Sequence, residues 1–164
     1  MRKSAPLAFI LVVLLAGCST ASDTSTDQSS AAETERLEAN KALARRWFDE
    51  VINKRNVDAI SDIYASDYAY HGPGGMEMSG TGPLREFAAA ILAASEDRQA
   101  VIHQQVAEGN LVVTRFTSTG TRTGPWMGEE PDSSIWITEG IDISRIENGR
   151  IVEDWEVIRD SSPE

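Results

Sequence analysis

The second half of the chain carries long stretches that are rich in β-branched and other apolar residues. They cover residues 101–107, 111–121, 134–146 and 150–158. Two short polar segments, Glu108-Gly109-Asn110 and Glu147-Asn148-Gly149, separate the members of each pair of stretches. Gly and Asn readily take the positive φ of a tight hairpin turn. This half is therefore predicted to form a meander of four long antiparallel strands.

The first half shows helical spacing instead. From Leu43 to Ile52 apolar side chains recur every three or four residues, which predicts an amphipathic helix over residues 34–53. A short second helix is expected over residues 57–64. A short strand over 68–71 then precedes a Gly/Pro loop, and a third helix is expected from Thr81 or Gly82. Helices followed by a meander predict an α+β fold. Because long strands curl, helices packed across the concave side would enclose a pocket.

The N-terminus has the pattern of a secretory signal. Arg2 and Lys3 precede an apolar run over residues 5–16, which is shorter than the ~20 residues of a membrane-spanning helix. Residues 15–18, Leu-Ala-Gly-Cys, resemble the bacterial lipobox. In that signal the cysteine is lipidated and becomes the first mature residue, so Cys18 is the expected anchor in the cell envelope. Ser19 implies the outer membrane where the cell has one; the alternative is an ordinary signal peptide.

Residues 19–34 contain only small and polar side chains. Such a segment buries too little apolar surface to offset the entropy of ordering, so we expect a flexible tether. The expected organisation is a signal over 1–18, a tether over 19–34 and one domain over 35–164.

Charge and composition exclude several classes of function. The chain has 15 basic and 26 acidic residues; without the first eighteen residues, 13 basic and 26 acidic residues leave a net charge of about −13. This disfavours nucleic acid as a partner, because phosphate binding needs clustered Lys and Arg. The single cysteine excludes an internal disulfide framework. No metal-ligand spacing and no phosphate-binding loop are found, so no metal and no cofactor are expected.

Several sequence landmarks occur in a characteristic order. They are Arg45 to Val51, Tyr68 to His71, Gly80 to Phe87, Gly120 to Gly128, and Ile143 to Glu156. This series resembles the SnoaL-like polyketide cyclase or ester cyclase family, of the nuclear transport factor 2-like fold, over residues 37–158. The resemblance implies a cone-shaped α+β fold with three N-terminal helices packed on a curved antiparallel sheet.

The resemblance also implies a chemistry. The family's best-understood members close a ring by an intramolecular aldol reaction without a cofactor, using a carboxylate on the last strand as acid and base. The turn-and-strand motif Gly-Arg-Ile-Val-Glu-Asp-Trp places that carboxylate at Glu156, where the family usually has Asp. Arg122 and Asp154 stand where family members often have His.

The last two strands bear the candidate acids. Strand parity puts Asp154 and Glu156 on one face and Glu153 and Trp155 on the other, but it does not decide which face lines a pocket. Counting outward from the hairpin, Asp142 opposes Trp155 within one residue. Asp142 and Glu156 are the candidate catalytic acids, because an apolar pocket and a second carboxylate both raise a pKa. The alternative is separate, solvated carboxylates.

Other side chains have one functional and one structural interpretation each. His71 is a candidate catalytic residue at the pocket mouth, able to share a proton with Glu156, or a loop cap; His103 is expected to be structural. Arg122 and Arg115 either pair with strand acids or hold an enolate oxygen. The aromatic residues Trp47, Trp126 and Trp155, together with Phe48, are expected in the core and rim, where the tryptophans also contact substrate.

Three functional hypotheses follow. The first is a cofactor-independent cyclase or isomerase that acts on a small carbonyl compound. The second is a non-catalytic envelope domain that binds a hydrophobic small molecule or a protein partner. The third is an interaction module that forms a homodimer through its open sheet.

Overall fold

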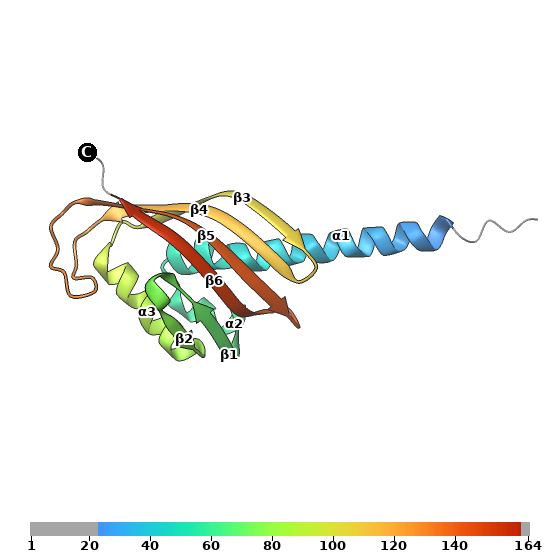
Figure 1. Ribbon diagram of the computed structural model, residues 1–164, viewed down its shortest axis with the longest axis horizontal. Coiled ribbons are helices and arrows are strands. Elements are labelled where there is room, and N and C mark those ends of the chain that lie inside the picture. Colours follow the sequence, from blue (N-terminus) through green and yellow to red (C-terminus); the bar gives the residue numbers. More distant parts are fainter. Residues whose placement is uncertain (1–22, 162–164) are drawn as a thin grey trace, which may run out of the picture.

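The computed structural model describes residues 23–161 as a curved sheet with helices against one face (Figure 1). The helical segments are α1 (Asp23–Arg46), a π-helical continuation (Trp47–Ile52), a short 3₁₀ turn (Val57–Ala59), α2 (Ile60–Ile63) and α3 (Thr81–Ala94). The strands are β1 (Tyr64–His71), β2 (Glu77–Ser79), β3 (Gln99–Glu108), β4 (Leu111–Thr121), β5 (Ile135–Glu147) and β6 (Arg150–Ser161). The predicted α+β class is confirmed.

The four long strands form the predicted antiparallel meander. The sheet order is β2-β1-β6-β5-β4-β3, and the turns at Gly109, Asn148 and Gly149 have positive φ, as the hairpin prediction requires. The prediction that the whole sheet is antiparallel was wrong, however, because β1 pairs with β6 in parallel. β1 enters the sheet directly from α2, and β2 then adds to the outer edge of β1. β2 was not predicted, since three residues are too few to show an alternating pattern.

Helix α1 begins earlier than the sequence indicated. Residues 23–34, expected to belong to a tether, are helical. Residues 28–36 are exposed, and Figure 1 shows this end of α1 extending beyond the sheet. Elongating an existing helix needs no new nucleus, so this segment is helical without a core contact. Arg36 adds an ion pair with Glu33 and donates to the backbone oxygen of Gly109 at 2.9 Å.

The predicted signal sequence, Cys18 and the first residues of the predicted tether lie outside the described residues. Within residues 23–161, no helix combines the length and the apolar character needed to cross a membrane.

The core is concentrated near the β5–β6 hairpin. Ile60 and Ile63 of α2 are fully buried against Tyr68, Ile151 and Val112. A smaller cluster forms where Phe48 packs on Phe116, with ring centroids 4.9 Å apart. The first cluster holds the helices against the hairpin end of the sheet, and the second holds Phe48 against its middle.

A bulge in β6 orients the residues that follow it. Ile151 pairs with Ile146, whereas Glu153 pairs with Arg145, so Val152 is the extra residue. Ile151 and Asp154 both face inward, although an unbroken strand would place them on opposite faces. From Asp154 onward the even-numbered residues face the helices. The bulge explains why simple parity did not identify the inner face.

Candidate functional site

A cavity of about 440 Å³ lies between the helices and the inner face of the sheet. Its wall is mostly apolar, with Trp47 and Phe48 after α1, Phe87 on α3 and Phe116 on β4. Gly140 makes room for the ring of Phe116, because a Cβ there would come 2.5 Å from that ring. The predicted pocket is therefore present, and its volume is in the range of small-molecule sites.

Three carboxyl groups line the cavity on the same face of β5 and β6. Asp142 pairs directly with Glu156, and Asp154 lies two rungs away, opposite Ser144. Directly opposed residues have Cβ atoms about 5 Å apart. The sequence placed Asp142 opposite Trp155 within one residue, and the observed partner is Glu156, inside that range. Both candidate catalytic acids thus face the same cavity.

Each of these carboxyl groups accepts a hydrogen bond from a hydroxyl group. Tyr70 donates to Glu156 Oε2 at 2.5 Å, Tyr68 to Asp154 Oδ2 at 2.8 Å, and Ser144 to Asp142 Oδ2 at 2.8 Å. Asp154 Oδ1 is buried without a partner. Each hydroxyl group fixes the orientation of one carboxyl group. It contacts only one of the two carboxyl oxygens.

The environment shifts the proton affinity of the acids upward. Burial raises the pKa of Asp142 well above its ordinary value, and the charges of Asp154 and Glu156 raise it further. Burial raises the pKa of Asp154 to about 7, although the hydrogen bond from Tyr68 opposes this. Burial also raises the pKa of Glu156, and the hydrogen bond from Tyr70 opposes the shift. Carboxyl groups this close in an apolar site do not all ionise together, so at least one retains a proton near neutral pH.

The two tyrosines come from alternate positions of β1. Tyr68 and Tyr70 point inward by strand parity, and both are buried. Gly72 makes room for the second, because a Cβ there would lie 2.3 Å from Tyr70 Cε1. The Gly/Pro loop after β1 therefore allows the ring of Tyr70 to reach β6.

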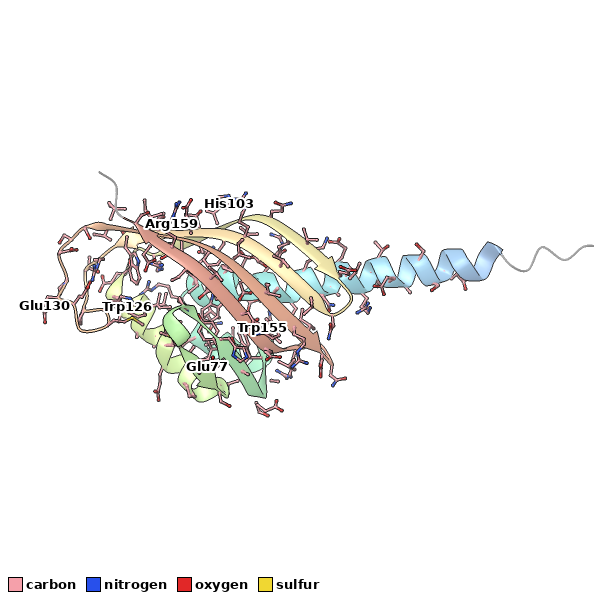
Figure 2. All side chains as sticks on the ribbon, in the orientation of Figure 1. Glu77, His103, Trp126, Glu130, Trp155 and Arg159 are labelled. Atoms are coloured by element: carbon pink, nitrogen blue, oxygen red, sulfur yellow. The ribbon has the colours of Figure 1, made fainter. Side chains whose placement is uncertain are left out.

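Aromatic side chains line the part of the cavity away from the core. Trp126 contacts Phe87 of α3 and Trp136 of β5, with ring centroids 5.8 and 5.3 Å apart. Figure 2 shows Trp126 between α3 and the strands. Trp47 also lines the cavity, packed edge-on against Tyr64. Two of the three tryptophans predicted to contact substrate therefore line the cavity.

His71 and Trp155 do not line the cavity. They follow Tyr70 and precede Glu156, so parity turns both to the outer side of the sheet. The His71 ring stacks on Trp155 and contacts Glu77 and Glu153 at 2.8 and 2.9 Å. The hydrogen bond with Glu153 raises the pKa of His71. This geometry contradicts two predictions. His71 does not share a proton with Glu156, and Trp155 does not face the cavity in which a substrate would bind.

Arg122 also lies outside the main cavity. Its guanidinium pairs with Glu129 at 2.6 Å, in a loop rather than with a strand acid. This position corrects its expected contact with substrate. Arg115 is exposed on the outer face, as is His103, whose ring contacts Thr117 at 2.8 Å. Figure 2 shows His103 on the side of the sheet that faces away from the helices.

Several polar cavity residues were not identified from the sequence. The alternation Tyr68-Ala69-Tyr70 was visible and could have indicated two hydroxyl groups on one strand face. Arg98 gave no signal, because it lies between α3 and β3 outside any recognised motif. It is 5% exposed, lines the cavity, and its guanidinium lies 4.0 Å from the centroid of Trp136.

Within the part of the chain that the structure describes, no group of three or more His, Cys, Asp or Glu side chains is arranged to hold a metal ion.

Comparisons with solved structures show the same fold. A candidate SnoaL-like polyketide cyclase from Jannaschia sp. CCS1 is 18% identical, with a TM-score of 0.69 over 74% of this chain and 86% of that chain. IdmH, a candidate polyketide cyclase from Streptomyces antibioticus, is 23% identical, with a TM-score of 0.63 over 73% and 91%. An LEH-like epoxide hydrolase from M. tuberculosis is 13% identical, with a TM-score of 0.61 over 76% and 85%.

A comparison with functionally curated proteins found no match. A family model described as SnoaL-like polyketide cyclase matches residues 42–163, which is most of the chain and nearly all of the described fold. This match agrees with the resemblance carried by the sequence landmarks and with the fold of the structural neighbours. The chain belongs to the SnoaL-like polyketide cyclase family.

Proposed function

We propose that the protein is a cofactor-independent enzyme of the cyclase or isomerase kind that acts on a small carbonyl compound. The observation that carries this proposal is the pair Glu156 and Asp142, directly opposed in an apolar cavity and oriented by Tyr70 and Ser144. Two carboxyl groups in one site suit acid–base chemistry when one is ionised and the other is protonated.

Glu156 is the proposed base. Tyr70 donates to its Oε2, which stabilises the carboxylate and leaves Oε1 to accept a proton. Burial raises the pKa of Glu156, so the carboxylate is a stronger base than one in water. A proton on the carbon next to a carbonyl is weakly acidic, and a raised base pKa favours its removal.

Asp142 is the proposed acid. Its pKa is raised well above the ordinary value, which keeps the carboxyl group protonated beside an ionised Glu156. Ser144 occupies Oδ2, so the proton is available on Oδ1. This assignment replaces His71 and Arg122, which lie outside the cavity.

The proposed reaction then balances with these two groups. Glu156 takes the proton from the carbon, the C–H electron pair forms a carbon–carbon double bond, and the carbonyl oxygen takes the proton of Asp142. For ring closure, the enol carbon attacks a second carbonyl of the same molecule. Glu156 gives its proton to the new alkoxide oxygen, and the enol proton returns to Asp142. For isomerisation, Glu156 gives its proton to a different carbon of the conjugated enol, the carbonyl forms again, and the enol proton returns to Asp142.

The alternative is a domain that binds a hydrophobic small molecule without turnover. The apolar wall of the cavity favours this function, because Phe48, Phe87, Phe116 and Trp126 would contact any apolar ligand. The two functions differ in what they require of Glu156.

We also propose that Cys18 anchors the protein to the cell envelope, at the outer membrane where one exists. The lipobox-like residues 15–18 support this location. Two or more acyl chains on one residue give stable anchoring, in contrast to a single chain.

Association through the outer face of the sheet is proposed as a further property. Val101, Val113, Ile141 and Val157 are exposed there, and Val157 is 74% exposed. An exposed apolar face of this kind favours contact with a second copy of the chain.

The enzymatic proposal is tested by Glu156→Gln with nitrobenzisoxazole as the probe. A general base removes the C–H proton of this compound, the N–O bond breaks, and a coloured phenolate forms. We expect the rate of the variant to be lower by about 100-fold or more at neutral pH, because a Gln amide does not act as a base there. Absorbance gives the rate, and Glu153→Gln on the outer face of the same strand is the matched control. Equal rates for wild type and Glu156→Gln would leave the binding domain as the better interpretation.

A second prediction concerns stability against pH. Asp154 has a folded-state pKa of about 7, above its unfolded value, so the folded protein binds more protons between the two values. Stability therefore falls as pH rises from about 4 to 7, by on the order of 2–4 kcal/mol from Asp154. Asp154→Asn should flatten this fall and be more stable than wild type above this range, as measured by urea denaturation. Asp67→Asn, an exposed change on β1, is the control. An unchanged pH profile in Asp154→Asn would contradict the assignment.

The anchor is tested by Cys18→Ser in a bacterial host that processes lipoproteins. We expect the variant to leave the membrane fraction, because no thiol remains to carry the lipid, whereas Ser19→Ala should stay there. Immunoblots of separated fractions measure the distribution. Retention of Cys18→Ser in the membrane would exclude lipidation as the anchor.

A further inference from the structure

The end of the cavity away from the carboxyl cluster has a different chemistry. Arg98 and Thr138 lie there, and Thr138 is four residues along β5 from Asp142. At about 3.3 Å per residue, the two ends are separated by roughly 13 Å along the strand. Between them the lining includes Phe116 and Ile158, which are apolar. The cavity therefore has the carboxyl cluster at one end, an apolar middle, and the Arg98 guanidinium together with the Asp160 carboxyl group at the other end.

The guanidinium of Arg98 is fixed but only partly satisfied. Nη2 donates to Thr138 Oγ1 at 2.7 Å, and that hydroxyl donates in turn to Asp160 Oδ1 at 2.6 Å. Trp136 covers one face of the guanidinium. Nη1 is buried and has no hydrogen-bond partner. A buried charged donor without a partner is costly, which makes this nitrogen a candidate for contact with a ligand.

A second orphaned polar atom lies at the same level of the sheet. Ser118 pairs with Thr138 across β4 and β5, is 5% exposed, and lines the cavity. Its Oγ is also buried without a partner. One hydroxyl group and one guanidinium nitrogen are thus available at one place, and both can donate a hydrogen bond.

Arg98 keeps its positive charge at neutral pH in spite of its burial. Burial lowers its pKa to about 10, while Asp160 and Glu156 act in the opposite direction, so the group stays protonated at neutral pH. Asp160 is connected to Arg98 through the Thr138 hydroxyl.

We propose that Arg98 and Ser118 form a binding site for a carboxylate at the end of a hydrophobic ligand. Arg98 Nη1 and Ser118 Oγ donate to the carboxylate oxygens, and Trp136 holds the guanidinium plane in position. This inference rests on the proposed function, because it defines the substrate as a hydrophobic carbonyl compound that also bears a carboxylate. The apolar middle of the cavity takes the carbon skeleton, and the carbonyl lies at Glu156 and Asp142.

The test uses decanoate, methyl decanoate and decanol as probes at neutral pH, with affinities measured by titration calorimetry. The chain is equally apolar in all three, and only decanoate carries a charge. We expect wild-type protein to bind decanoate about tenfold more tightly than either neutral probe, or better, because a hydrogen bond to a charged group is lost in the others. Equal affinity for decanoate and decanol would overturn the proposal, and this comparison needs no variant.

Two variants then locate the site. Arg98→Gln should lose the preference for decanoate, and Ser118→Ala, a small truncation, should reduce it several-fold. Arg115→Gln removes one positive charge from the outer face and should keep the preference. A preference that survives in both Ser118→Ala and a folded Arg98→Gln, as judged by thermal melting, would place the anion elsewhere and contradict the proposal.

The outcome is separable from that of the proposed function. Binding of decanoate involves no proton transfer, and nitrobenzisoxazole carries no carboxylate. Loss of the decanoate preference in Arg98→Gln with no effect of Glu156→Gln on turnover would support the carboxylate site and reject the acid–base function. The reverse result would support the acid–base function and reject the carboxylate site.

Discussion

The burial of three carboxyl groups side by side is the constraint on which the site depends. Asp142, Asp154 and Glu156 lie within two rungs of each other on the same face of two strands, in a cavity with a largely apolar wall. Ionising all three there would be unfavourable, because burial and mutual repulsion both oppose it. The hydroxyl groups of Tyr68, Tyr70 and Ser144 offset part of this cost and fix the carboxyl orientations. The same arrangement that costs stability provides a base and an acid in one place.

Three features of the fold make this arrangement. The bulge at Val152 brings Asp154 and Glu156 to the inner face. Parallel pairing of β1 with β6 places Tyr68 and Tyr70 beside those acids. The core below, around Ile60 and Ile63, holds the helices against the hairpin end of the sheet while the cavity stays open. The strands thus position the polar groups, and the apolar wall comes from the helices together with strand residues such as Phe116.

The sequence predicted the fold better than it predicted the site. Strand period and hairpin residues located the meander to within a few residues, because long strands and tight turns have strong local patterns. Glu156 followed from the resemblance to the family's turn-and-strand motif, and counting along the hairpin placed Asp142 opposite Trp155 within one residue. His71, Trp155 and Arg122 were misplaced because a resemblance gives residue order without the side-chain direction. Arg98 and the β1–β6 contact depend on pairing between segments far apart in the chain, which local patterns do not contain.

The most direct test of the account is the proton affinity of the acids themselves. Carboxyl-carbon NMR of Asp142 and Glu156, followed across a pH titration, reports when each group loses its proton. The account predicts that both titrate above the ordinary carboxyl range, with Asp142 the last to ionise, because burial and the neighbouring charges act on it together. Ordinary carboxyl pKa values for both groups would contradict the account, because they would show that the two acids are not desolvated in this cavity.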